Sequence, residues 1–191
     1  MKKIAWIITR VFDPVLEIPL AVCMTIGYAV VSDLWLKIGT VLIFFYVLVP
    51  AVYFVMRIKR GKVSDWDVSK REERKAIYEF CVASHFLGIL AAAVFGQFLL
   101  VKILLVLWLV SVIFMIVNVY WKISVHAGVN MLVVVLLNNF WGWRVSGWLI
   151  MVLLVVMWSR IVLKKHSVTQ VVAGAAVAFI LVEVGLRVIG V

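Results

Sequence analysis

Long apolar runs separated by short polar breaks are the dominant pattern along this chain. Most runs approach the ~20 apolar residues that a helix needs to cross a bilayer. Their continuity differs from the alternation of apolar and polar positions that is typical of membrane β-strands. We therefore predict seven membrane-spanning helices, at about residues 16–33, 36–56, 76–96, 99–119, 125–141, 145–163 and 167–189.

Composition narrows the class of protein further. The chain has 191 residues, of which 66% are apolar and 15% charged, and its mean hydropathy is +1.19. A soluble globular protein is about half apolar and a quarter charged, so soluble, disordered, coiled-coil and collagen-like classes are excluded. The expected fold is an all-α, polytopic transmembrane helical bundle of six to seven spans, in one integral membrane domain covering residues 1–191.

Positive charge is distributed unevenly between the ends of the predicted helices. With seven spans, fifteen of the 19 Lys and Arg residues fall on one face and four on the other. Because Lys and Arg concentrate in cytoplasmic loops, we expect the basic face to be cytoplasmic. This face holds the amino terminus, the 57–75 loop, the 120–124 turn and the 160–166 turn.

The loop at residues 63–75 is the first of three polar segments on that face. Arg71 and Arg74 are three residues apart, so on a helix they share a face and can bind one anion. Guanidinium groups bind phosphoryl oxygens in a bidentate manner. Ser69 followed by Glu72 has the spacing of a capping box, which predicts a helix from about Lys70. An ordinary solvated loop would explain the same residues.

The second segment begins the fifth predicted span. Ser124 is a suitable N-cap, and it would place His126 in the first turn, where backbone N–H groups and the helix dipole favour an anion. Lys122 is close by in the sequence. A purely structural role is the common one for a single histidine at a helix end, and it remains the alternative.

The third segment joins the sixth and seventh predicted spans. Arg160 ends one span, His166 begins the next, and Gln170 follows one helical turn after His166. A Gln170 side chain can bind one imidazole nitrogen and leave the other for chemistry, which suits a histidine nucleophile. His85 lies about ten residues inside the third span, and we expect it to be a buried packing or hydrogen-bonded residue.

Taken together, these segments resemble the type-2 phosphatidic acid phosphatase family, lipid phosphatases that share a fold with vanadium haloperoxidases. The family's third motif is Ser-Arg, five residues, His, three residues, then Asp. Here Ser159 and Arg160 are followed at the same spacing by His166 and then by Gln170 in place of the Asp. The resemblance covers about residues 65–190, with the motifs in the family's order.

The other two motifs match in part. In the second, Pro-Ser-Gly-His, Ser124 and His126 are present, whereas positions 123 and 125 carry Ile and Val. In the first, Lys-x6-Arg-Pro, Arg74 is present, but Asp67 occupies the usual Lys position and Lys75 the Pro position.

The resemblance implies a function for each matching residue. His166 would attack phosphorus and form a phosphohistidine, Gln170 would orient it, and His126 would protonate the leaving oxygen. The phosphoryl oxygens would be held by Arg74, Arg160 and Ser124, with the missing Lys replaced by Lys70, Arg71 or Lys122. Such a site needs no metal or cofactor, because fixed cations and N–H donors supply the electrostatic stabilisation.

Two functions are consistent with these residues. The first is hydrolysis of a lipid phosphate or prenyl diphosphate at the cytoplasmic face of a prokaryotic inner membrane. The second is a catalytically lapsed relative that binds anionic lipid or a membrane partner, which Gln170 favours.

Basic residues also anchor proteins to anionic leaflets at about 1 kcal/mol each, so nucleic-acid binding is not needed to explain the charge. The small-residue stripe around Gly174 and Ala178 indicates close helix packing and permits a homodimer.

Overall fold

Helices account for most of the chain in the computed structural model, which describes residues 1–30 and 33–191. No β-strand occurs in these residues, so the prediction of an all-α fold is confirmed. The helices are α1 (Lys2–Val11), α2 (Pro14–Ala29), α3 (Trp35–Ile43), the π-helical turn η1 (Phe44–Leu48), α4 (Val49–Lys59), α5 (Arg71–Ala93), α6 (Phe98–Tyr120), α7 (Val125–Trp141), α8 (Trp143–Ser146), α9 (Leu149–Val162) and α10 (Val168–Ile189).

Internal contacts divide the chain into two compact units. Unit 1 consists of residues 1–24 and 122–191, and unit 2 consists of residues 25–121. Helix α2 begins in unit 1 and ends in unit 2. The second and third polar segments therefore belong to unit 1, and the first belongs to unit 2.

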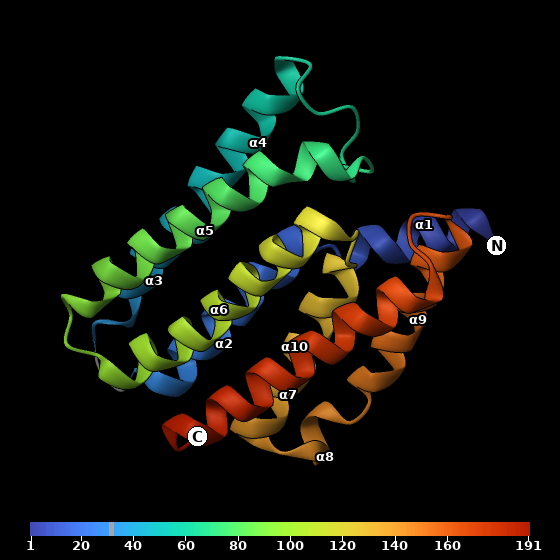
Figure 1. The fold of residues 1–191 in the computed structure, drawn as a ribbon. Coiled ribbons are helices and arrows are strands. Elements are labelled where there is room, and N and C mark those ends of the chain that lie inside the picture. The colour runs from blue at the N-terminus through green and yellow to red at the C-terminus, as the bar shows by residue number, and fades with distance from the viewer. Residues whose placement is uncertain (31–32) are drawn as a thin grey trace. The chain divides into compact units, whose positions relative to one another are not determined.

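Unit 1 is built around the pairing of α7 with α10, which run alongside each other (Figure 1). Helix α9 packs against both, and the amino-terminal helix α1 packs on α9. Buried apolar side chains from α7, α9 and α10 form the core of this pairing: Ala127, Leu153, Val171 and Ala175. Helix α1 was not among the predicted spans, and Ala5 and Thr9 are its buried residues.

Gly174 sets how closely α10 approaches the start of α7. A Cβ atom at this position would overlap the carbonyl oxygen of Ser124. The close packing predicted from the small residues of this helix is therefore confirmed at Gly174. Because the contact is with a backbone atom, no side-chain rotation can relieve it.

We expect Gly174→Ala to destabilise the protein by about 1–3 kcal/mol, the usual cost of overpacking a well-packed interior. Thermal unfolding in detergent measures the effect. Gly27→Ala in α2 is the matched control, because its added Cβ meets nothing within 4 Å beyond its chain neighbours and the adjacent backbone of its own helix, and alanine favours a helix over glycine. Equal unfolding temperatures for the two variants would contradict the close contact.

Unit 2 contains one long helix interrupted by a π turn. Helices α3 and α4 continue each other through η1, and α5 packs against all three. At the π turn the Ser84 hydroxyl donates a hydrogen bond to the Phe45 carbonyl at 2.6 Å, and the His85 ring stacks on Tyr46 with 4.2 Å between centroids. His85 is buried, as predicted.

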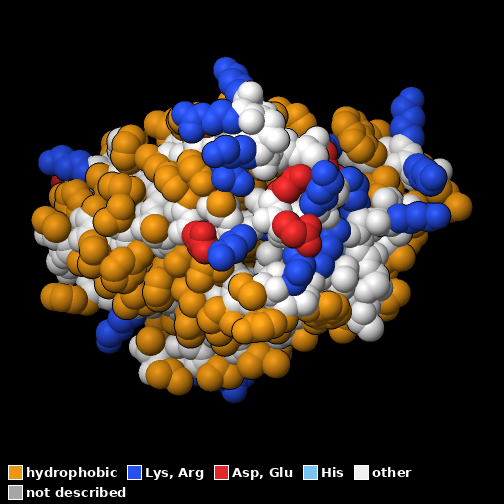
Figure 2. Space-filling model, turned by 45° about the horizontal axis from the view of Figure 1, so that its top comes forward, with side chains coloured by type: hydrophobic (Ala, Val, Ile, Leu, Met, Phe, Trp, Pro, Cys, Tyr) orange, Lys and Arg blue, Asp and Glu red, His pale blue; other side chains and the backbone are white. Residues whose placement is uncertain are grey.

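Within residues 1–30 and 33–191, four helices are long and apolar enough to cross a membrane: Trp35–Lys59, Arg71–Ala93, Phe98–Tyr120 and Val168–Ile189. Only 17–39% of the most apolar 18-residue window of each is buried, so most of their apolar surface faces outward. Large parts of the visible surface are accordingly hydrophobic (Figure 2). These features are those of a membrane protein.

The remaining predicted spans correspond to shorter helices. Helices α7 and α9 are apolar but have 17 and 14 residues, which correspond to about 25 Å and 21 Å. The predicted span at 16–33 corresponds to the 16-residue helix α2, and its residues 31–32 lie outside the described part of the chain. Each predicted span thus contains a helix, while the count of six to seven crossings stays a prediction.

The capping box predicted at the start of α5 is wrong. The N-cap of α5 is Lys70, with no side-chain hydrogen bond to the helix. Ser69 instead donates its hydroxyl to the Asp65 carboxylate at 3.0 Å. A capping box occurs at the start of α10, where Ser167 caps the helix and Gln170 binds back to the backbone of Ser167. In the loop before α5, the Ser69 hydroxyl donates to a charged carboxylate, and this hydrogen bond is stronger than the one that the hydroxyl oxygen would accept from a neutral backbone N–H as a cap.

Candidate active site in unit 1

The second and third polar segments meet in unit 1. The Ser124 backbone N–H donates a hydrogen bond to the Gln170 carbonyl at 3.3 Å, and the Lys122 ammonium donates to the Lys165 carbonyl at 2.8 Å. Ser124 is the N-cap of α7, as predicted, and its hydroxyl accepts a hydrogen bond from the Ala127 N–H. These contacts hold the start of α7 against the start of α10.

His166 is 7% exposed and lies just before α10, where Gln170 determines its tautomer. Oε1 of Gln170 lies 3.1 Å from Nδ1 of His166 and accepts the backbone N–H of Ser167 at 3.2 Å. Because a backbone N–H can only donate, the amide must present its oxygen to both groups. Nδ1 of a neutral His166 is therefore the protonated nitrogen, and Nε2 carries the lone pair.

Arg160 is 1% exposed and is held at the end of α9. Its Nη1 donates to the Thr9 hydroxyl of α1 at 2.7 Å, and its carbonyl accepts the N–H groups of Lys165 and His166 at 3.0 and 3.3 Å. The chain turns here through Lys164, whose φ of 55° lies in the left-handed region. This turn brings the His166 backbone to the Arg160 carbonyl.

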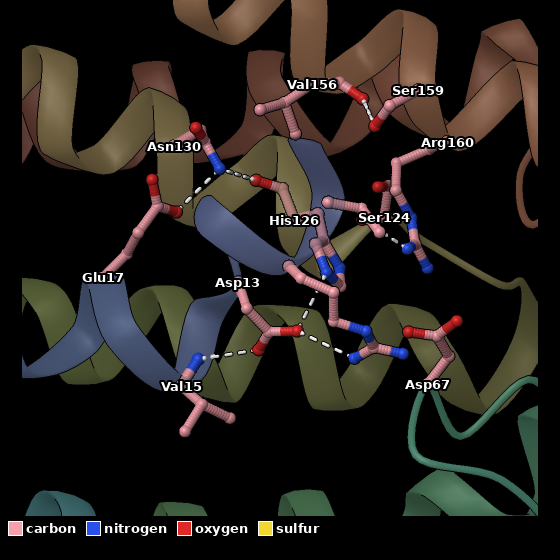
Figure 3. Close-up of polar contacts among 12 residues, drawn as sticks. Asp13, Val15, Glu17, Asp67, Ser124, His126, Asn130, Val156, Ser159 and Arg160 are labelled. Atoms are coloured by element: carbon pink, nitrogen blue, oxygen red, sulfur yellow. Dashed lines mark hydrogen bonds and ion pairs between the residues drawn. The ribbon is translucent and has the colours of Figure 1, made fainter. Parts of the chain in front are cut away.

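His126 lies in the first turn of α7 and is 8% exposed. Its Nε2 is 3.6 Å from Oδ2 of Asp13, an ion-pair distance (Figure 3). The same Asp13 oxygen binds Arg10 at 3.3 Å. The Asn130 amide donates to the His126 carbonyl at 2.8 Å and to Glu17 at 2.6 Å. The segment between α1 and α2 therefore faces His126.

Asp13 is a carboxylate at neutral pH. Burial by itself raises the pKa of its carboxyl group, but the closeness and charge of His126, the hydrogen bond from the Val15 amide and the charge of Arg10 outweigh burial and lower the pKa. Because the pKa is lowered on folding, the stability that the ionised form provides is present above the ordinary value of 3.8 and is lost as pH falls through the folded value.

The two predicted arginines of the 57–75 loop belong to unit 2. The Arg71 guanidinium donates to the Val119 carbonyl at the end of α6, and Nε of Arg74 donates to the Val68 carbonyl at 2.8 Å. Arg74 is buried, whereas Arg71 lies nearer the surface. Their use by a phosphate group stays a prediction.

Sequence reasoning missed the contribution of the amino-terminal segment. Thr9 contacts Arg160, and Asp13 contacts His126, yet neither belongs to a recognisable motif. The available signal was Asp13 itself, a charged residue directly before an apolar run. In the described residues, no three His, Cys, Asp or Glu side chains are grouped so that they could hold a metal ion.

No family model matches this chain, and neither does a curated protein or a solved structure. The resemblance to the lipid phosphatases therefore depends on the motif residues themselves.

Proposed function

We propose that this protein is a metal-independent membrane lipid phosphatase that hydrolyses a lipid phosphate or prenyl diphosphate through a phosphohistidine. One observation carries the proposal. The imidazole of His166 is oriented by Gln170 so that Nε2 holds the lone pair, and the backbone N–H of His166 donates to the carbonyl of the buried Arg160. A positioned nucleophile and a fixed cation are what phosphoryl transfer needs.

The proposed reaction has two steps. Nε2 of His166 attacks phosphorus and the N–P bond forms, while the bond to the leaving oxygen breaks and that oxygen takes a proton from His126. Water then attacks phosphorus, the N–P bond breaks and neutral His166 is restored, while a proton of the water passes to His126 and inorganic phosphate leaves. Arg160 holds the phosphoryl oxygens throughout, with Ser124 as a further donor.

Gln170 is compatible with this chemistry. An amide that turned its NH₂ toward His166 would favour the wrong tautomer, and the asparagine substitution in the serine-protease triad costs about 10⁴-fold for that reason. Here the Ser167 N–H requires the oxygen to face His166. The neutral amide adds no negative charge to stabilise an imidazolium, so a smaller cost is expected to remain.

The proposal includes a placement in the membrane. Helices α2, α7 and α9 would join the four longer helices as crossings, giving six to seven spans in a prokaryotic inner membrane. The positive-inside rule then places the site and the basic loops at the cytoplasmic face. The lipid tails of the substrate would lie along the apolar outer surface of the helices.

A catalytically lapsed protein that binds anionic lipid is the second candidate. Gln170 in the Asp position and the replaced Lys and Pro of the first motif favour it. Such a protein would retain the buried cation and the histidines without turnover.

Phosphate release in detergent tests the proposal. Phosphatidate, lysophosphatidate and polyprenyl diphosphates are supplied to the purified protein with a metal chelator present, and inorganic phosphate is measured. We expect release from at least one substrate, and inhibition by vanadate. No release from the whole panel, with vanadate still bound, would reject the enzyme and support the lapsed protein.

A further inference from the structure

His126 and His166 are both buried in unit 1, but they have different polar partners. His166 faces the neutral amide of Gln170, whereas His126 faces the carboxylate of Asp13. A carboxylate near an imidazole favours its protonated form, and a neutral amide has no comparable effect. The two environments thus favour different protonation states, as enzymes that combine an acid with a nucleophile require.

We propose that Asp13 is a positioning residue that holds His126 as the protonated acid for the leaving oxygen. This inference rests on the proposed phosphatase function. Because Nε2 of His126 faces Asp13 (Figure 3), the proton passes to the leaving oxygen from Nδ1. Asp13 remains ionised, and water returns the proton to His126 in the second step.

Several contacts hold the Asp13 carboxylate in place. Its other carboxylate oxygen accepts the Val15 N–H at 3.0 Å, at the start of α2, and Arg10 of α1 binds the oxygen that faces His126. On the other side of His126, Asn130 ties its carbonyl to Glu17 of α2. The Asp13 carboxylate and the backbone that carries His126 are therefore both held in place.

Other charged groups of unit 1 do not replace Asp13. Arg10 and Arg160 are cations, which disfavour a protonated imidazole. Glu17 accepts a hydrogen bond from the Asn130 amide at 2.6 Å. The carboxylate that bears on the His126 ring is thus Asp13.

Asp13→Asn keeps the shape of the side chain and removes its charge, so it separates acid catalysis from folding. Two substrates are compared: a short-chain phosphatidate, whose alkoxide leaving group needs a proton, and p-nitrophenyl phosphate, whose leaving group does not. Because a positioned general acid contributes about 10²- to 10⁴-fold, we expect Asp13→Asn to lose about that factor on phosphatidate. Release of p-nitrophenol should stay near the wild-type rate.

Two further variants complete the experiment. Asp13→Glu restores the charge and should recover part of the phosphatidate rate. Glu183→Gln removes another carboxylate of unit 1, which binds Asn139 and Arg187, and should leave the ratio of the two rates unchanged. Unfolding temperatures in detergent establish that each variant is folded.

The outcomes distinguish this inference from the proposed function. Equal losses on both substrates in folded Asp13→Asn, or no loss on either, would overturn the role of Asp13 while leaving the phosphatase in place. A wild-type protein that releases nothing from p-nitrophenyl phosphate or from the whole panel of phosphatidate, lysophosphatidate and polyprenyl diphosphates would overturn the phosphatase, and the role of Asp13 with it.

Discussion

Replacing His166 by alanine is expected to lower phosphate release by about 10⁴- to 10⁶-fold, because loss of a covalent nucleophile removes the entire two-step route. The side chain is buried, its Nδ1 is bound by Gln170, and Nε2 carries the lone pair. A labelled substrate adds a direct measurement. Rapidly quenched wild-type protein should retain acid-labile phosphate, and His166→Ala should retain none.

The control for this variant is a buried histidine outside unit 1. His85 stacks on Tyr46 in unit 2, so His85→Gln removes an imidazole without touching the proposed site. We expect it to release phosphate near the wild-type rate. If His166→Ala keeps its activity, the nucleophile is another residue or the release comes from a contaminant.

Arg160→Lys is the second large effect that we expect. Lysine keeps the positive charge but lacks the planar fork that binds phosphoryl oxygens in a bidentate manner. Removing one donor from a site of this kind costs about 10²- to 10³-fold. The loss should appear in kcat, because the charge and geometry of the phosphoryl group that Arg160 binds develop in the transition state.

Arg187→Met is the matched control for Arg160→Lys. Arg187 lies on α10 in the same unit, is largely exposed and pairs with Glu183 four residues earlier. An exposed pair of this kind contributes about 0.3–0.5 kcal/mol, so both stability and phosphate release should change little. Wild-type kinetics in Arg160→Lys would remove Arg160 from the phosphate-binding site, and an equal loss in Arg187→Met would indicate a general effect on folding.

The helices themselves were largely predictable. Seven apolar runs were identified, and each contains a helix, with α7 covering the same residues as the predicted span. Hydropathy is informative here because backbone groups inside a bilayer must be satisfied within their own segment, so a long apolar run has to be helical. The short contacts at helix ends were also predictable where they are local, as for Ser124 and for His166 with Gln170.

The capping of α5 shows where local reasoning failed. Ser69 and Glu72 have the right spacing for a capping box, but Ser69 binds Asp65 and the helix begins at Arg71. As a cap, the Ser69 oxygen would accept a backbone N–H of the helix, whereas here the hydroxyl donates to Asp65, and spacing alone does not rank the two arrangements. Similarly, Arg71 and Arg74 share a helix, yet their guanidinium groups reach carbonyls on different segments.

The sequence by itself determined the helical membrane class, the order of the polar segments and the pairing of His166 with Gln170, because each depends on residues within one run or one helical turn. Only the tertiary structure decided that Thr9 meets Arg160 and that Asp13 meets His126. More than a hundred residues separate each of these pairs. An apolar run does not specify which other helix it packs against or how the two helices are aligned. Only the packing of α1, α7, α9 and α10 therefore brings such groups together.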